Sequence, residues 1–144
     1  MSEPVDVDYA SITSLDLSNQ QLDVLPDLSM YINLIKLNCN CNNLTALDNL
    51  PPNLKSLCCC YNQITLLDNL PSSLLELYCY DNKLISLDNL PPNLLELYCY
   101  NNQITLLDNL PSSLLKLSCY GNPIIYDFEP TLENIRNYNA TRIA

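Results

Sequence analysis

A pattern of apolar and polar residues repeats every 20 residues along most of this chain. One copy contains Leu54, Leu57, Cys59, Asn62 and Ile64. The next three copies are Leu74, Leu77, Cys79, Asn82 and Leu84, then Leu94, Leu97, Cys99, Asn102 and Ile104, then Leu114, Leu117, Cys119, Asn122 and Ile124. A fixed period of about 20 residues is typical of a solenoid, in which each repeat forms one coil and packs on its neighbours.

Two further copies lie upstream, so we expect six coils. They are Leu34, Leu37, Cys39, Asn42 and Leu44, and a less regular copy of Ile12, Leu15, Leu17, Gln20 and Leu22. Within each copy, apolar residues alternate with polar or aromatic ones over a short segment, which indicates a half-buried strand. Because one coil of this length cannot bury its own apolar stripe, we expect the strands to stack as one parallel sheet.

The pattern L-x-x-L-x-[LC]-x-x-N-x-[LI] resembles the leucine-rich repeat family. The L-D-N-L-P segment that follows it is similar to the short form of this repeat, known from bacterial effectors and giant-virus proteins. The resemblance covers residues 12 to about 126. It implies an α/β, β-rich fold: a right-handed solenoid of about six coils, with one parallel sheet on its concave face.

We expect one domain over residues 1–144, with an N-terminal segment (1–11), the repeats (12–126) and a C-terminal cap (127–144). The period ends after Gly121-Asn122-Pro123, and the spacing that follows predicts a short helix over Pro130–Tyr138. Leu132 and Ile135 are spaced to cover the last coil. Residues 1–11, with Val5, Val7 and Tyr9, show no helical pattern and predict at most an extended cap.

The asparagine of each copy lies where the chain turns out of its strand. A buried turn leaves backbone N–H and C=O groups that need partners, and an amide side chain both donates and accepts. We therefore expect a structural ladder, with Gln20 in its place in the first coil. Its members are Asn42, Asn62, Asn82, Asn102 and Asn122.

The return segment of each coil, such as Leu67 to Pro71, is too short for a helix, and its proline favours tight-turn or polyproline geometry. A row of aspartates precedes these prolines: Asp48, Asp68, Asp88 and Asp108. We expect these carboxylates to accept hydrogen bonds from nearby backbone N–H groups. Calcium binding by the stacked carboxylates is the alternative.

The eight cysteines divide into two groups. Five occupy inward positions usually held by leucine, which predicts buried, reduced thiols in a row: Cys39, Cys59, Cys79, Cys99 and Cys119. The alternation places the other three outside the core: Cys41, Cys58 and Cys60. We expect these three to be exposed thiols, with metal binding or redox chemistry as alternatives.

Charge and composition exclude several classes of function. The net charge is −10, so the surface repels phosphates and argues against nucleic-acid binding. No apolar run reaches the roughly 18 residues of a membrane span, and the first ten residues lack the pattern of a signal peptide. With reduced thiols, this predicts a cytoplasmic protein, acting in its own cell or a host cell.

Catalysis finds no support in the sequence. There is no histidine for general-base work, and a single glycine leaves no phosphate-binding loop. The resemblance includes effectors that act as ubiquitin ligases, whose catalytic cysteine lies in a separate C-terminal domain for which this chain has no room. We therefore expect no enzyme activity, and neither a cofactor nor a metal.

Six of the ten tyrosines are predicted to point outward from the C-terminal half of the sheet. They are Tyr61, Tyr78, Tyr80, Tyr98, Tyr100 and Tyr120. Tyrosine is enriched at binding hot spots because it offers a large rigid contact area with a polar tip. The same residues could instead only stabilise neighbouring strands.

Acidic residues accompany these tyrosines: Glu76, Glu96 and Asp81. We therefore predict a protein-interaction module whose concave face binds a protein with a basic or mixed surface. A monomer is expected, with a homodimer as the alternative. The rival interpretations are a self-associating solenoid that uses its weakly capped N-terminal edge, and a thiol redox or metal-binding module.

Overall fold

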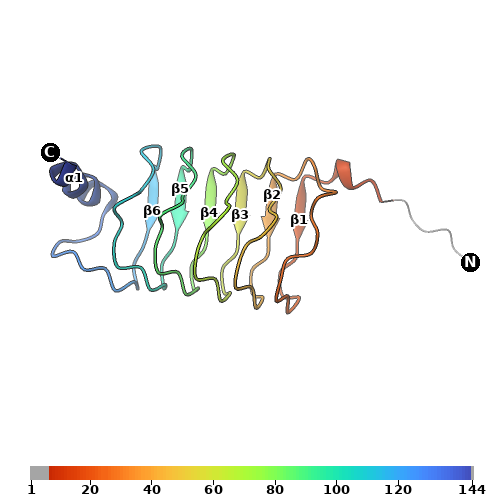
Figure 1. Ribbon diagram of the computed structural model, residues 1–144, viewed down its shortest axis with the longest axis horizontal. Helices are drawn as coiled ribbons and strands as arrows, with labels where there is room; N and C mark the ends of the chain where they lie inside the picture. The colour runs from red at the N-terminus through yellow and green to blue at the C-terminus, as the bar shows by residue number, and fades with distance from the viewer. Residues whose placement is uncertain (1–6, 144) are drawn as a thin grey trace, which may run out of the picture.

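A computed structural model describes residues 7–143 of the chain, and Val5 lies outside this range. Six short strands lie side by side and all run in the same direction (Figure 1). They are β1 (Ser14–Asp16), β2 (Lys36–Asn38), β3 (Ser56–Cys58), β4 (Glu76–Tyr78), β5 (Glu96–Tyr98) and β6 (Lys116–Ser118). Each strand neighbours the next one in the chain, which confirms the predicted parallel solenoid with one strand per coil.

The 20-residue period sets the register of the sheet. Leu57 pairs with Leu77, and Leu77 with Leu97, so equivalent residues form rows along the solenoid. The first coil is longer, since Ser14 pairs with Lys36, 22 residues further on. The outward-pointing side chains of these strands, and of the residue or two after each strand, form the concave face.

The core consists of rows of leucine, isoleucine and cysteine. In one coil, Leu54, Leu57 and Ile64 are completely buried, and burying such a side chain contributes about 1.5–3 kcal/mol. The five period-20 cysteines are also buried, which confirms their predicted place in the core: Cys39, Cys59, Cys79, Cys99 and Cys119. Their burial follows from register, because each occupies an inward position next to its equivalents.

The predicted asparagine ladder is present. Asn82 is buried, and its Nδ2 donates to the carbonyl oxygens of Cys59 (3.0 Å) and Cys79 (3.2 Å). Its Oδ1 accepts from the backbone N–H of Ile64 at 3.0 Å. Equivalent contacts are made by Asn42, Asn62, Asn102 and Asn122. Each asparagine thus bridges its own coil and the preceding one.

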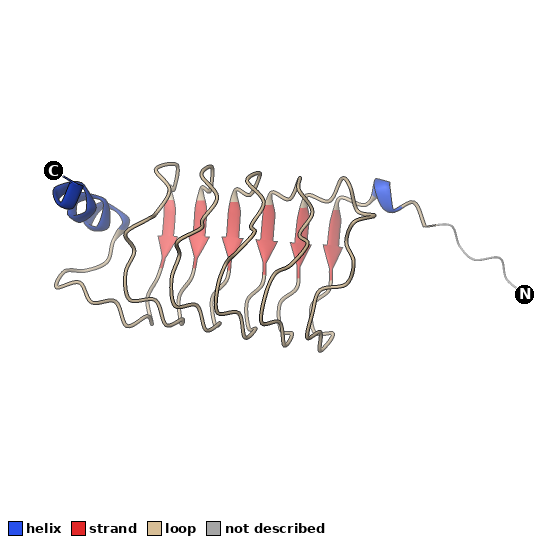
Figure 2. Cartoon of the chain, viewed as in Figure 1, coloured by secondary structure: helices blue, strands red, loops and turns tan. Residues whose placement is uncertain are grey.

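The return segments are loops and turns (Figure 2). The aspartate row was predicted to accept hydrogen bonds from backbone N–H groups, and this prediction is wrong. No backbone N–H within residues 7–143 donates to these side chains. Instead, Asp68 accepts from Asn89 Nδ2 (3.1 Å) and Asp88 from Asn109 Nδ2 (3.3 Å). The Asn of the following coil lies within reach of each carboxylate because the coils stack in register. These bonds join one coil to the next.

The last aspartate of the row, Asp108, belongs to the C-terminal cap. Its carboxylate accepts from the hydroxyl of Tyr126 (3.2 Å) and pairs with Arg142 (3.1 Å). Arg142 lies on helix α1 (Leu132–Ile143). The ion pair therefore ties the last coil's return segment to the helix that covers it.

Helix α1 closes the C-terminal end of the stack (Figure 1). It begins later and ends later than the predicted Pro130–Tyr138. Thr131 Oγ1 accepts from Asn134 N–H at 3.2 Å, so the cap lies one residue after the proline. Ile135 is completely buried, as predicted for a residue that covers the last coil.

The N-terminal end differs from the predicted extended cap. Tyr9–Ser11 form a short 3₁₀ helix, η1, in which Ser11 Oγ donates to the carbonyl oxygen of Asp8 at 2.8 Å. The Tyr9 ring packs edge-on against Tyr31, with 5.2 Å between centroids. This local hydroxyl-to-backbone bond favours a turn over an extended segment. First-coil residues such as Leu15 and Leu17 remain only half-buried, because the described chain places no coil outside them.

Candidate functional site

The concave face carries two rows of tyrosines that run along the solenoid axis. The first row comes from strands β4 and β5, where Tyr78 and Tyr98 lie in register. The second row consists of the residues two positions further on: Tyr80, Tyr100 and Tyr120. The 20-residue period produces both rows, because it places tyrosine at the same position of successive coils.

The rings within each row are stacked nearly parallel. The centroids of Tyr78 and Tyr98 are 4.9 Å apart with an angle of 4° between the planes. Separations in the second row are 4.2 Å for Tyr80–Tyr100 and 4.5 Å for Tyr100–Tyr120. Because neighbouring rings cover one another's faces, the rows offer a partner mainly ring edges and hydroxyl groups.

The hydroxyls of Tyr78 and Tyr80 hold their protons more strongly than an exposed tyrosine does. Burial raises the pKa of Tyr78 and of Tyr80, and the nearby charge of Glu76 raises that of Tyr78 further. These two hydroxyls are therefore neutral donors and acceptors. Their chemistry suits hydrogen bonding and apolar contact with a partner rather than acid–base work.

Two glutamates lie beside the first row, and their surroundings differ. Glu96 Oε1 is 2.7 Å from Lys116 Nζ, and Glu96 Oε2 accepts from the hydroxyl of Tyr98 at 3.3 Å. The hydrogen bond from Lys116 lowers the pKa of Glu96. Glu76, one strand away, has no such ion pair among the described residues. Its negative charge is therefore not balanced by a cation within ion-pair distance.

Tyr61 and Asp81 lie beside the rows in a left-handed turn that the sequence did not predict. The residue at this position of every coil has a φ of 53–68°: Asn19, Cys41, Tyr61, Asp81, Asn101 and Gly121. Asn, Asp and Gly tolerate this conformation best, so their recurrence was the available signal. Asp81 Oδ1 accepts from Asn101 Nδ2 at 3.2 Å, and the ring of Tyr61 meets Tyr80 edge-on with centroids 5.5 Å apart.

The three cysteines predicted outside the core differ in their exposure to solvent. Cys41 is exposed and Cys58 is half-buried, but the exposed position predicted for Cys60 is wrong, since this residue is completely buried. Its thiol lies within hydrogen-bonding reach of the Tyr80 side chain of the next coil, which alternation along one strand does not predict. Burial raises the pKa of the Cys60 thiol to about 12.

The structure does not assemble these thiols into a metal site. Within residues 7–143, no group of three His, Cys, Asp or Glu side chains has the geometry to hold an ion. All eight cysteines are free. The weak contacts of the buried thiols go to carbonyl oxygens, as from Cys39 Sγ to Cys58 O at 3.4 Å.

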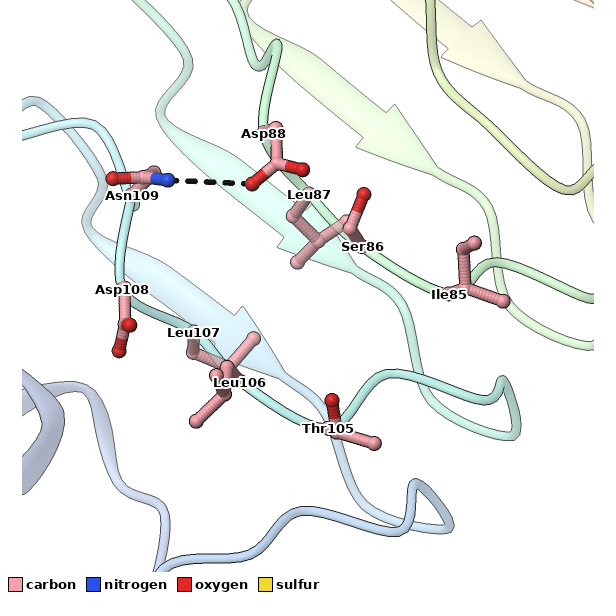
Figure 3. A pocket seen from close by; sticks show the side chains of 9 residues that line it. All are labelled: Ile85, Ser86, Leu87, Asp88, Thr105, Leu106, Leu107, Asp108 and Asn109. Carbon is pink, nitrogen blue, oxygen red and sulfur yellow. Dashed lines mark hydrogen bonds between the residues drawn. The ribbon is translucent and has the colours of Figure 1, made fainter.

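A shallow groove on the return side was not predicted from the sequence. It lies between two successive coils and has a volume of about 220 Å³. Figure 3 shows Ile85, Leu106 and Thr105 in its lining, with the hydrogen bond between Asp88 and Asn109 at one end. Return segments, unlike the strands, carry no tyrosine in this region, so the groove is separate from the concave face.

No helix in the described part of the chain is long and apolar enough to cross a membrane. No protein-family model and no curated protein matches the chain. Among solved structures it is similar to YopM from Yersinia enterocolitica WA-314, with 36% identity over 76% of this chain and a TM-score of 0.63. It is also similar to a Shigella effector LRR domain, with 32% identity over 85% of this chain and a TM-score of 0.75.

The chain spans 24% of the Yersinia protein's chain and 54% of the Shigella chain. The similarity therefore covers only a part of each of these structures. It agrees with the register of the sheet, the asparagine ladder and the 20-residue period described above. The chain belongs to the leucine-rich repeat family, in the short-repeat form of bacterial effectors.

Proposed function

We propose that this chain is a non-enzymatic module whose concave face binds a protein partner. The observation that carries the proposal is the pair of tyrosine rows on the sheet. Stacking these residues for stability alone would not require their edges to remain accessible, yet all five rings are partly or largely exposed. Aromatic side chains with a polar tip are typical anchors of protein interfaces.

The chemistry of the face favours a partner with a basic or mixed surface. Neutral hydroxyls and ring edges can pack against apolar and polar groups, while Glu76 supplies an uncompensated negative charge. The net charge of −10 adds long-range attraction toward basic proteins and repulsion of nucleic acids. We further propose that the module works in a reducing, cytoplasm-like compartment, since its core contains free thiols.

A pull-down from host-cell lysate tests this function. Replacing Tyr80 and Tyr100 by Ser removes two anchors from the face. The matched control replaces Leu66 and Leu106 by Ser, since both are exposed apolar residues of return segments. We expect the tyrosine variant to lose the captured protein and the leucine variant to keep it. Equal capture by both folded variants would contradict the proposal.

Self-association through the N-terminal edge is a second candidate, favoured by the first coil. Leu15, Leu17 and Leu22 are only partly buried, although the equivalent residues of the second to fifth coils are buried. The edge strand β1 also leaves backbone groups on its outer side without a partner strand in the described chain. Light scattering over a concentration series distinguishes the candidates, because self-association predicts a mass that rises with concentration.

A further inference from the structure

The sequence Glu-Leu-Tyr occurs twice on the concave face, once on β4 and once on β5. The two copies lie in register, with Glu76 beside Glu96 and Tyr78 beside Tyr98. Two carboxylates on neighbouring strands repel each other, so each copy favours a cation nearby. The pair has two outer sides, one toward β6 and one toward β3.

On the side of β6, the chain supplies the cation itself. Lys116 lies in register with Glu96, and its Nζ is 2.7 Å from the Glu96 carboxylate. The same carboxylate accepts a hydrogen bond from the hydroxyl group of Tyr98. One side of the Glu-Leu-Tyr pair is therefore already occupied by a positively charged side chain.

On the side of β3, the equivalent positions hold small residues. Ser56 lies in register with Glu76, in the relation that Lys116 has to Glu96, and Cys58 lies in register with Tyr78. Within residues 7–143 the Tyr78 ring stacks on Tyr98 alone, and no cation lies over it. Lys36 of the same row is two strands from Glu76, or about 10 Å by sheet spacing. Lys55, the residue before Ser56, is exposed and forms no ion pair with Glu76 within the described residues.

We propose that the surface above β3, where the small residues Ser56 and Cys58 adjoin Glu76 and Tyr78, receives an arginine side chain of the protein partner. This inference rests on the proposed function of the concave face and adds the chemistry of one contact. The guanidinium group pairs with the Glu76 carboxylate and stacks on the open face of the Tyr78 ring. The partner's arginine thus supplies on the β3 side the cation that Lys116 supplies on the β6 side.

Arginine fits this surface better than lysine for two reasons. Its planar guanidinium can form two parallel hydrogen bonds to a carboxylate, and it stacks on an aromatic face. The stack of Tyr78 on Tyr98 holds the ring in place before the partner arrives, so little conformational freedom is lost on binding. Ser56 and Cys58 are short enough to leave space for the long aliphatic part of the arginine.

NMR titration with the peptide acetyl-Gly-Arg-Gly-amide tests the inference, with the neutral citrulline peptide as the reference for charge. We expect saturable amide shifts centred on β3 and β4 with the arginine peptide only. Glu76→Gln and Tyr78→Leu should each weaken binding roughly two- to fivefold, while Tyr78→Phe should retain it. Each variant is first checked for cooperative unfolding.

The sharpest variant is Ser56→Lys, which gives Glu76 an internal cation as Lys116 does for Glu96. It should abolish peptide binding, whereas the control Ser118→Lys adds the same charge on β6 and should leave the β3 response within about twofold. Shifts spread over the acidic surface, or equal responses of both lysine variants, would overturn the inference. If this occurs while Tyr80→Ser, Tyr100→Ser still abolishes partner capture, the proposed function stands and only the arginine site is lost.

Discussion

Replacing Asn82 by Ala tests how the ladder stabilises the solenoid, and the contacts set the expected magnitude. The amide of Asn82 donates to the carbonyls of Cys59 and Cys79, but each of these also receives a bond from a second ladder residue. The N–H of Ile64 donates to Asn82 Oδ1 and to no other acceptor within the described residues. The variant therefore leaves one buried N–H without a partner.

An unsatisfied buried backbone group costs about 1–3 kcal/mol, so Asn82→Ala should lower the free energy of unfolding by that amount. Equilibrium urea denaturation at an unchanged slope measures the difference. The matched control is Asn43→Ala, since Asn43 is exposed and its side chain makes no hydrogen bond within the described chain. Its substitution should stay within about 0.5 kcal/mol. Equal losses for the two variants would refute the assignment of the ladder.

Three further predictions follow from burial and packing. Thiol titration of freshly purified, unfolded protein should find all eight cysteines free, and in the folded protein Cys41 should react first because it is exposed; protected disulfides would contradict this. Burial raises the pKa of Cys39 from 9.0 to about 12, so the unfolded chain loses this proton before the folded one does. Under reducing conditions the melting temperature should therefore be insensitive to this thiol below pH 9 and fall as pH rises toward 12, more steeply than in Cys39→Ala. Ile135→Ala should cost about 2–5 kcal/mol in urea denaturation, since the side chain is completely buried under helix α1, and a loss below about 0.5 kcal/mol would mean that the helix does not cap the stack.

The sequence was sufficient for features that depend on the repeat period alone. Leu57 and Asn82 could be placed because each has equivalents 20 residues away, and stacking turns such equivalence into contact. The positions of the tyrosine rows followed for the same reason. The repeat period predicts the row in which a residue lies.

Features that depend on a neighbour's side chain could not be predicted in this way. Cys60 occupies an outward position, yet it is completely buried, and its thiol contacts the Tyr80 side chain of the next coil. Asp68 bonds to the amide of Asn89 rather than to its own turn, because the competing partner comes from the next coil. Likewise, Glu76 and Glu96 have different surroundings because Ser56 lies beside Glu76 and Lys116 lies beside Glu96. The alternation of apolar and polar residues does not predict this difference.

Site-specific photo-crosslinking tests the central claim, that a protein partner binds the concave face. A benzophenone amino acid placed at Ser118 lies in register with Tyr98 and leaves every tyrosine in place. The same amino acid at Leu106 reports on the groove of the return side. We predict that the captured partner crosslinks from position 118 and not from position 106. Crosslinking from position 106 alone would contradict the claim and place the interface on the return side.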